Sequence, residues 1–548
     1  MPSIYRLPSK RVIATDLPKS LWTTPAVVRM QAEKYGARHF CAFHDGARLS
    51  FLDLETQSNA LASALAGLGV QPGDRVMALL HNSREFILTM VATHKRKAIF
   101  VPINTELKGA FLQHQIRNAE PRVVVIDAEL RAAFESIDLC GSGIETSVIV
   151  GGAPAPLSGT RAFAFEELAA TSPRAEDTIS VTPYDACTIM FTSGTTGPAK
   201  GVLMPHAHCY YYAWSANRST ALTENDRMYI SMPLFHGTAC LLQFYGSLLA
   251  GAPTYVAKRF SASSWLSDIR ECGASVTYAV GVMPEFILKQ PRRDDDKDNP
   301  LRLSWSVPVS DAWGREFEER FGLRILQGYG MTEFSVPVWG DLRDPVKAGC
   351  AGRVVDEFFE VRIVDPETDE PMGAHEIGEI VVRPKEPSVF MAGYFRMPEK
   401  TVEAWRNLWF HSGDAGYFDN EGRLFYVDRI RDRIRRRGEN VSAYEVEEVI
   451  NSHPDVVQSA VVGVKVAGAG GEDEILACIV PSSDTLDAKM ILDWCVTRMP
   501  RFALPRFIRF MDDIERTASG KIRKQALRDA GVTPTTWDRE AEGYVVAR

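Results

Sequence analysis

The sequence has 548 residues, of which 45% are apolar and 24% charged, as is typical of a globular protein with two or three domains. The net charge of −8 argues against a nucleic-acid-binding protein, and no apolar run reaches the roughly 18 residues that span a bilayer. The N-terminal stretch lacks the apolar core of a secretory signal, so we expect a cytoplasmic protein. The nine cysteines form no C-x-x-C pair, which indicates neither a zinc site nor a disulfide framework.

The first third of the chain alternates helical and strand patterns. A helix is predicted after Ser50, because Ser50 and Asp53 can form a capping box and leucines follow at helical spacing as far as Gly69. Short apolar runs with helix-compatible stretches between them predict four strands, at residues 75–80, 99–104, 122–127 and 146–150. This alternation is typical of the α/β class, in which helices cover a mostly parallel sheet.

The pattern changes in the rest of the chain. Residues 157–185 are rich in turn residues and are predicted to be a connector. Short strands and turns at about 350–430 indicate a β-rich part, and a smaller α+β pattern follows a basic run. We therefore expect an N-terminal domain over residues 1–430 and a separate C-terminal domain over residues 431–548.

Glycines, hydroxyls and one lysine follow an apolar run in the stretch TSGTTGPAK. The stretch fails the Walker spacing, because Gly194 and Gly197 lie too close together and Lys200 is followed by glycine. Hydroxyls, glycine backbone N–H groups and a lysine can nevertheless bind a phosphate. From these residues alone, a structural turn and a phosphate-binding loop both remain open. The candidate phosphate ligands are Thr192, Ser193, Gly194, Thr195, Thr196, Gly197 and Lys200.

The longer string TIMFTSGTTGPAKGV closely resembles the signature of the adenylate-forming enzymes, which include acyl-CoA synthetases, peptide-synthetase adenylation domains and luciferases. Four further motifs resemble those of this family and occur in its order. They are QGYGMTE (327–333), WFHSGDAGYF (409–418), the hinge-like segment at 422–450 and RTASGKIRKQALR (516–528). The resemblance covers roughly residues 50–530 and implies a large N-terminal domain with a small mobile C-terminal domain.

The resemblance implies an ATP-dependent carboxylic acid–CoA ligase. A small-molecule carboxylate would react with ATP and Mg²⁺ to give acyl-AMP and pyrophosphate, and the thiol of coenzyme A would then displace AMP. The matching motifs make Glu333 the Mg²⁺ ligand and place Thr332 at the α-phosphate and Tyr329 near the adenine. Asp414 and Arg429 would contact the ribose.

The resemblance also implies roles for residues of the C-terminal domain and for one residue of the acyl pocket. Lys521 matches the lysine that bridges the carboxylate and the α-phosphate, so this domain must close over the large one during adenylation. For the second step the domain would rotate about Arg431, and Arg435 and Gly438 would then face the path of CoA. His236 matches a residue at the mouth of the acyl pocket, where it would position the acid or gate its entry.

Two departures from the family pattern leave the identity of the acid substrate open. SWSVPVSDAW (304–313) stands where the family usually has GGAPL, as in its carnitine/crotonobetaine-CoA ligase-like branch. HKRKAIF (94–100) replaces a Gly-Ala turn. We expect a small or medium acid that is hydrophobic or carnitine-like. The alternatives are an adenylation protein that serves a carrier protein, a luciferase-like oxidase and a silent acyl-nucleotide binder. The oligomeric state stays open, with a homodimer as one alternative.

Overall fold

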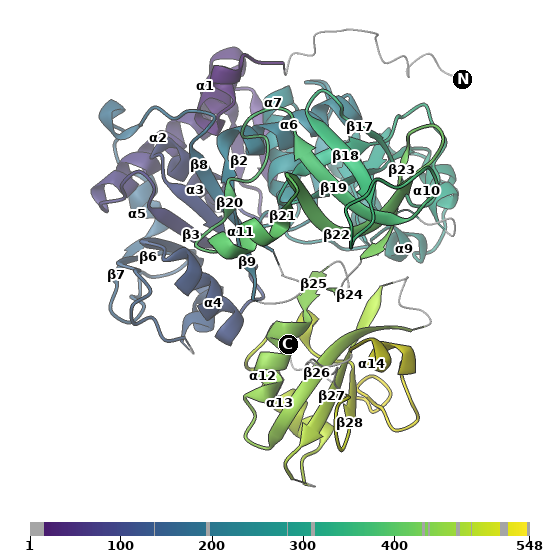
Figure 1. Ribbon diagram of the computed structural model, residues 1–548. Coiled ribbons are helices and arrows are strands. Elements are labelled where there is room, and N and C mark those ends of the chain that lie inside the picture. The colour runs from purple at the N-terminus through teal and green to yellow at the C-terminus, as the bar shows by residue number, and fades with distance from the viewer. Residues whose placement is uncertain are drawn as a thin grey trace.

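The computed structural model describes residues 16–135, 137–192, 198–281, 283–307, 309, 313–429, 433–436, 439–466, 472–483, 485–515 and 524–544. A large N-terminal part contains three sheets, and a separate C-terminal domain with its own sheet lies below it in Figure 1. Among the described helices, none is both long enough and apolar enough to cross a membrane.

The first sheet carries the strand that leads into the candidate phosphate loop. In spatial order its strands are β20 (Gly393–Tyr394), β9 (Lys200–Pro205), β8 (Ala186–Thr192), β4 (Ile99–Pro102), β3 (Arg75–Leu79), β5 (Val123–Asp127), β6 (Thr146–Val150) and β7 (Arg161–Ala164). The four predicted strands are confirmed as β3 to β6, which are parallel neighbours. Their burial on both faces matches their continuous apolar runs.

Local sequence signals explain the helix that follows Ser50. The Ser50 Oγ accepts a hydrogen bond from the Asp53 N–H at 3.0 Å, and the Asp53 carboxylate accepts one from the Ser50 N–H at 2.9 Å. This confirmed capping box starts α2 (Phe51–Gly67), and Gly69 follows its end with a φ of 88°. The predicted connector at 157–185 was wrong in part, because it contains β7 and α5 (Phe165–Ala169), whose Phe165 is fully buried.

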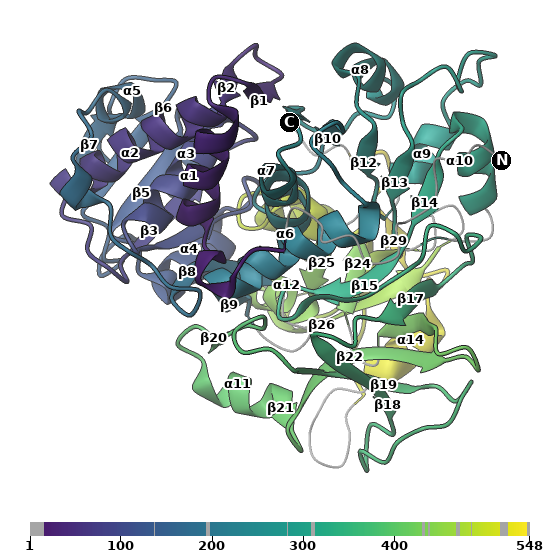
Figure 2. The ribbon, with the colours of Figure 1, turned by 90° about the horizontal axis from the view of Figure 1, so that it is seen from above.

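A second, mostly parallel sheet lies beside the first one. Its spatial order is β14 (Arg324–Leu326), β13 (Leu303–Trp305), β12 (Val276–Tyr278), β10 (Met228–Ile230), β11 (Thr254–Val256), β1 (His39–Phe43) and β2 (Arg48–Ser50). The remaining longer helices of the N-terminal part are α1 (Thr24–Tyr35), α3 (Arg84–Lys95), α4 (Gly109–Ala119), α6 (His206–Thr220), α8 (Trp265–Cys272) and α10 (Gly314–Phe321). The shorter ones are α7 (Gly246–Ala250), α9 (Met283–Leu288) and α11 (Pro398–Ala404). Viewed from above, α6 runs through the middle of this part, between the two parallel sheets (Figure 2).

The third sheet is antiparallel throughout and begins before the β-rich region expected from the sequence. Its spatial order is β15 (Gly328–Met331), β16 (Ser335–Trp339), β17 (Cys350–Val354), β23 (Leu424–Arg429), β22 (Trp409–Phe418), β19 (Gly378–Pro384) and β18 (Phe359–Val364), with β21 (Trp405–Arg406) beside β22. Two of the family-like motifs lie in this sheet: YGMTE begins on β15 and continues into the turn that follows it, and HSGD lies on β22.

The C-terminal domain begins with a hairpin made of β24 (Arg433–Arg436) and β25 (Glu439–Ser442). Its main sheet has the order β26 (Val456–Lys465), β27 (Asp473–Pro481), β28 (Phe507–Phe510) and β29 (Trp537–Asp538). Its helices are α12 (Ala443–Asn451), α13 (Ala488–Val496) and α14 (Lys524–Ala530). Val446, Val449 and Ile450 form the buried face of α12. The expected hinge residue Arg431 lies outside the described residues.

The unusual stretch HKRKAIF ends α3 and buries a lysine. The Lys95 Nζ donates to the Glu55 carboxylate at 2.7 Å and to the Asn59 side-chain oxygen at 2.7 Å. The Lys95 side chain is only 1% exposed. Burial lowers the pKa of Lys95 to about 8, although the charge of Glu55 acts in the opposite direction.

The buried lysine predicts a specific pH dependence of stability. Because the pKa of Lys95 rises from about 8 to its ordinary value on unfolding, the unfolded chain binds an extra proton between these two pH values. The free energy of unfolding of the wild type should therefore rise with pH in this window, by up to about 1.4 kcal/mol per pH unit relative to Lys95→Met. Urea unfolding of both proteins from pH 7 to 10 measures this difference. A difference that does not change with pH would contradict it.

Candidate active site

The segment that joins the first and third sheets organises the candidate site. β20 pairs with β9, with Tyr394 opposite Val202, just after the candidate phosphate loop. The Met391 N–H, shortly before β20, donates to the Glu333 carbonyl oxygen at 2.9 Å. The backbone therefore brings the YGMTE turn close to the strand that begins at Lys200.

The Glu333 carboxylate lies at this junction and is almost fully buried, with 3% of the residue exposed. The Tyr394 hydroxyl donates to its Oε1 at 2.9 Å. The Lys200 Nζ lies 4.1 Å from the centre of the Tyr394 ring, at cation–π distance. A single tyrosine thus touches the candidate Mg²⁺ ligand on one side and the candidate phosphate lysine on the other.

Glycine is required in the turn that presents Thr332 and Glu333. A Cβ at Gly330 would lie 2.1 Å from the Ser335 carbonyl oxygen, which is far inside contact distance. Ser335 itself has a φ of 62°, so the chain reverses sharply between β15 and β16. Thr332 is half-buried in this turn. The Tyr212 hydroxyl of α6 donates to the Met331 carbonyl oxygen at 2.8 Å and supports the turn from below.

Asp414 lies on β22, and only 2% of the residue is exposed. The Tyr329 hydroxyl donates to its Oδ2 at 2.9 Å, so the two residues expected near the ribose and the adenine are in direct contact. Arg429 lies opposite Asp414 in the register of β22 and β23. The backbone therefore supports the expected grouping of Tyr329, Asp414 and Arg429, although the structure does not describe the Arg429 side chain.

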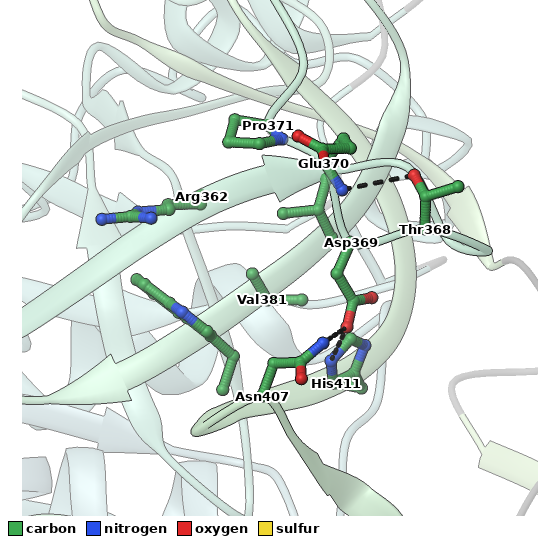
Figure 3. A pocket seen from close by; sticks show the side chains of 10 residues that line it. Arg362, Thr368, Asp369, Glu370, Pro371, Val381, Asn407 and His411 are labelled. Atoms are coloured by element: carbon green, nitrogen blue, oxygen red, sulfur yellow. Dashed lines mark hydrogen bonds and ion pairs between the residues drawn. The ribbon is translucent and has the colours of Figure 1, made fainter.

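A small pocket of about 200 Å³ lies on the antiparallel sheet and is lined in part by β22, the strand that carries Asp414 (Figure 3). His411 lines it, and the His411 Nδ1 lies 2.8 Å from the Glu379 carboxylate. The other oxygen of this carboxylate accepts a hydrogen bond from the Gly413 N–H at 2.9 Å. His411 and Glu379 therefore fix the backbone immediately before Asp414.

His236 precedes the π-helix η5 (Thr238–Tyr245) and faces the C-terminal domain. Its side chain is 44% exposed, and its Nε2 lies 3.6 Å from the Glu439 Oε1 of the hairpin. Glu106, on the segment after β4, lies near the same carboxylate. Burial and the negative charge of Glu439 raise the pKa of Glu106. The hairpin thus reaches between two segments of the N-terminal part.

Further contacts join the two parts of the chain beside the phosphate loop. The Ala199 N–H donates to the Glu445 carboxylate of α12 at 2.7 Å. A Cβ at Gly109 would lie 2.8 Å from the Arg498 carbonyl oxygen, so α4 begins directly against the C-terminal domain. A groove of about 610 Å³ runs between α4 and α12 and is bordered by Pro198.

Part of the expected site lies where the structure gives no description. Ser193 to Gly197, Gly438 and Lys521 are outside the described residues, as are the side chains of Arg429 and Arg435. Thr192 and Lys200 flank the candidate loop, and the Thr192 hydroxyl donates to the Lys200 carbonyl oxygen at 3.5 Å. The roles of all these residues therefore stay predictions.

Two residues of the site were missed by the sequence reasoning. Tyr394 is almost 200 residues from Lys200 in sequence and meets it only through the pairing of β20 with β9. Glu439 lies inside the hinge-like segment at 422–450, but its role needs His236 as a partner. No local pattern marks Tyr394, whereas an acid beside the conformationally free Gly438 was a usable signal for Glu439.

Comparison with known proteins places this geometry in a family. Residues 28–395 match the AMP-binding enzyme family and residues 445–521 match the AMP-binding enzyme C-terminal domain. The chain is 32% identical over 517 residues to a crotonobetaine/carnitine–CoA ligase of Salmonella paratyphi A, covering 91% of this chain and 97% of that protein.

Two structures of one enzyme from Bacillus subtilis, o-succinylbenzoate CoA synthetase, are also similar. A double mutant bound with the product analogue OSB-NCoA has a TM-score of 0.80, with 26% identity and coverage of 92% and 98% of the two chains. The complex with AMP has a TM-score of 0.65, with 26% identity and coverage of 92% and 99%. The chain therefore belongs to the AMP-binding enzyme family, as an adenylate-forming acyl-CoA ligase.

Proposed function

We propose that the chain activates a small or medium carboxylic acid with ATP and transfers the acyl group to coenzyme A, using two arrangements of its C-terminal domain. The observation that carries this proposal is the difference between the two B. subtilis complexes. The same enzyme matches this chain with a TM-score of 0.80 when bound to a CoA product analogue and 0.65 when bound to AMP. This difference supports a thioester-forming arrangement for the structure described here.

In the proposed first step, a carboxylate oxygen attacks the α-phosphorus of ATP, and the bond to pyrophosphate, the leaving group, breaks. Because both reactants are anionic, catalysis consists of positioning and charge neutralisation. Lys200 and the hydroxyls of the phosphate loop would bind the phosphates. Asp414 would bind the ribose beside Tyr329. Glu333 fits a Mg²⁺ ion that is also bound by nucleotide phosphates, because one buried carboxylate is a typical protein contribution to such a site. When bound, the ion would offset the negative charge of the phosphates.

Lys521 would complete this step from the C-terminal domain. The motif around it is the basis for this assignment, and Thr332 would hydrogen-bond the α-phosphate from the other side. In the arrangement described here, α12 of the C-terminal domain lies against Ala199, through the hydrogen bond from the Ala199 N–H to Glu445. A rotation near Arg431 is therefore part of the proposal.

In the proposed second step, the hairpin replaces Lys521 at the active-site edge. The His236–Glu439 contact would hold the imidazole away from the acyl carbonyl, so that a thiol can approach. Arg435 and Gly438 would lie along the path of the thiol. The groove between α4 and α12 supports a route for the long CoA arm, because it runs along the boundary of the two parts.

The acid is proposed to be short, with an apolar or carnitine-like end. Trp305 stacks on Tyr278 with ring centres 5.2 Å apart, and the Trp305 ring lies where a Cβ at Gly328 would be 2.7 Å away. This bulk supports a short pocket beside β15. Aromatic faces also bind quaternary ammonium groups, which agrees with the activity named for the Salmonella relative. ATP and CoA are cytoplasmic substrates, so we place the enzyme there.

An acid panel tests this function most directly. We expect ATP-dependent pyrophosphate release with short acids, and a thioester only when CoA is added. Crotonobetaine and its uncharged carbon analogue 5,5-dimethylhex-2-enoate differ only in the ammonium charge, so their kcat/KM ratio decides between the two kinds of end group. Acyl-adenylate that accumulates unchanged in the presence of CoA would refute CoA as the acyl acceptor. A lack of pyrophosphate release with every acid would refute the activation step.

Two substitutions should separate the half-reactions. Lys521→Ala should abolish adenylation but spare thioester formation from a preformed acyl-adenylate, because its charge acts only in the first arrangement. Glu439→Gln should do the reverse and slow acyl transfer about tenfold or more, since the contact with His236 belongs to the second arrangement. Single-turnover assays of each step measure both effects. Equal losses in the two steps for either variant would rule out two arrangements.

A further inference from the structure

The hairpin β24–β25 needs support from outside itself. In the described part of the chain its two strands form a two-stranded sheet of their own. A sheet of this size is marginally stable in water unless it packs against something else. The hairpin nevertheless carries Glu439 to His236, and a contact at 3.6 Å across two domains requires a fixed strand.

Apolar side chains fix one end of the hairpin to the C-terminal domain. Ile434 and Val441 are opposite each other in the register, and each is only 1% exposed. They belong to a core that also contains Ile475 of β27 and Ile508 of β28. This packing lies two positions away from Arg436 and Glu439, the last described pair of the hairpin, which we call its tip, so the tip must be held by something else.

A buried cation holds the tip. Arg436 is 1% exposed, and its Nε lies 2.6 Å from the Glu474 Oε2 on β27. Its Nη1 donates to the Phe502 carbonyl oxygen at 3.1 Å and to the Leu504 carbonyl oxygen at 2.8 Å. These three contacts all lie inside the C-terminal domain. A planar guanidinium can satisfy several acceptors at once in a way that lysine cannot.

Arg436 is also the cross-strand partner of Glu439 in the hairpin register. The backbone of the residue that contacts the N-terminal part is thus held by the residue that is anchored in the C-terminal domain. When the domain rotates, the anchor rotates with it, because none of these three contacts crosses the domain boundary.

We propose that Arg436 is a positioning residue for acyl transfer: it fixes the hairpin tip rigidly to the C-terminal domain, so that rotation of this domain carries Glu439 to His236. Arg436 acts through Glu439 and does not touch the substrate. The inference rests on the proposed transfer to CoA. It predicts that loss of the anchor weakens the second half-reaction and leaves the first, which uses Lys521, largely unchanged.

The test compares Arg436→Gln with a control of the same chemistry in the same domain. Arg509 on β28 is also buried, and it donates to the Thr536 hydroxyl at 3.1 Å and to the Gly531 carbonyl oxygen, away from the hairpin. Arg509→Gln therefore reproduces the loss of a buried arginine without releasing the tip. Arg436→Gln combined with Glu474→Gln removes the anchor without leaving a buried carboxylate unpaired.

In the full-length enzyme we expect Arg436→Gln and the double variant to slow single-turnover transfer from a preformed acyl-adenylate to CoA by roughly 10- to 100-fold, with ATP–pyrophosphate exchange within about threefold of the wild type. Arg436→Lys should recover part of the rate, and the decrease should fall on kcat more than on the KM for CoA. Arg509→Gln should not reproduce this split between the two half-reactions.

Two results would overturn the proposal: an unchanged transfer rate in Arg436→Gln, or equal losses of exchange and transfer in the double variant. A wild-type enzyme that makes the adenylate but transfers nothing to CoA would instead overturn the proposed function on which the inference rests.

Discussion

Polar contacts join the two parts of the chain at the active-site edge, and the account of function depends on them. His236 contacts Glu439, and the Ala199 N–H donates to Glu445. Each contact joins an N-terminal residue of the candidate active site, or a neighbour of one, to a carboxylate of the C-terminal domain. Polar contacts of this kind form and break at low cost, because water can solvate each partner after separation. The boundary therefore suits a domain that takes up more than one position.

The candidate site residues of the N-terminal part, by contrast, are held in place by their neighbours. Glu333 and Asp414 are both nearly fully buried, and each accepts a hydrogen bond from a tyrosine hydroxyl at 2.9 Å. Buried carboxylates are costly unless donors or cations surround them. Tyr329 and Tyr394 orient the two acids in advance, which leaves less reorganisation for the step in which nucleotide and metal would bind.

The sequence predicted the elements whose signals are local. The capping box at Ser50 and the four apolar runs of the parallel sheet gave the correct helix and strands, because both patterns act within a few residues. The family-like motifs assigned Tyr329 and Asp414 to one nucleotide site, and the two side chains are in contact although 85 residues separate them, but their roles stay predictions. Tyr394 and Arg436 could not be found in this way. Their roles come from strand pairing and from burial against distant carbonyl groups, which no local pattern encodes.

The central claim is that the C-terminal domain takes up two positions relative to the N-terminal part, and that this structure shows one of them. Spin labels can be attached to the exposed Cys140 of the N-terminal part and to Val457→Cys on the C-terminal domain, where Val457 is 65% exposed. The substitution Cys350→Ser removes a partly exposed cysteine that would also take up label. Pulsed electron paramagnetic resonance then measures the distance between the two labels. With an acyl-adenylate analogue and CoA, the account predicts the distance of this structure. With a non-hydrolysable ATP analogue and the acid, it predicts a clearly different distance. One unchanged distance in both states would contradict the account.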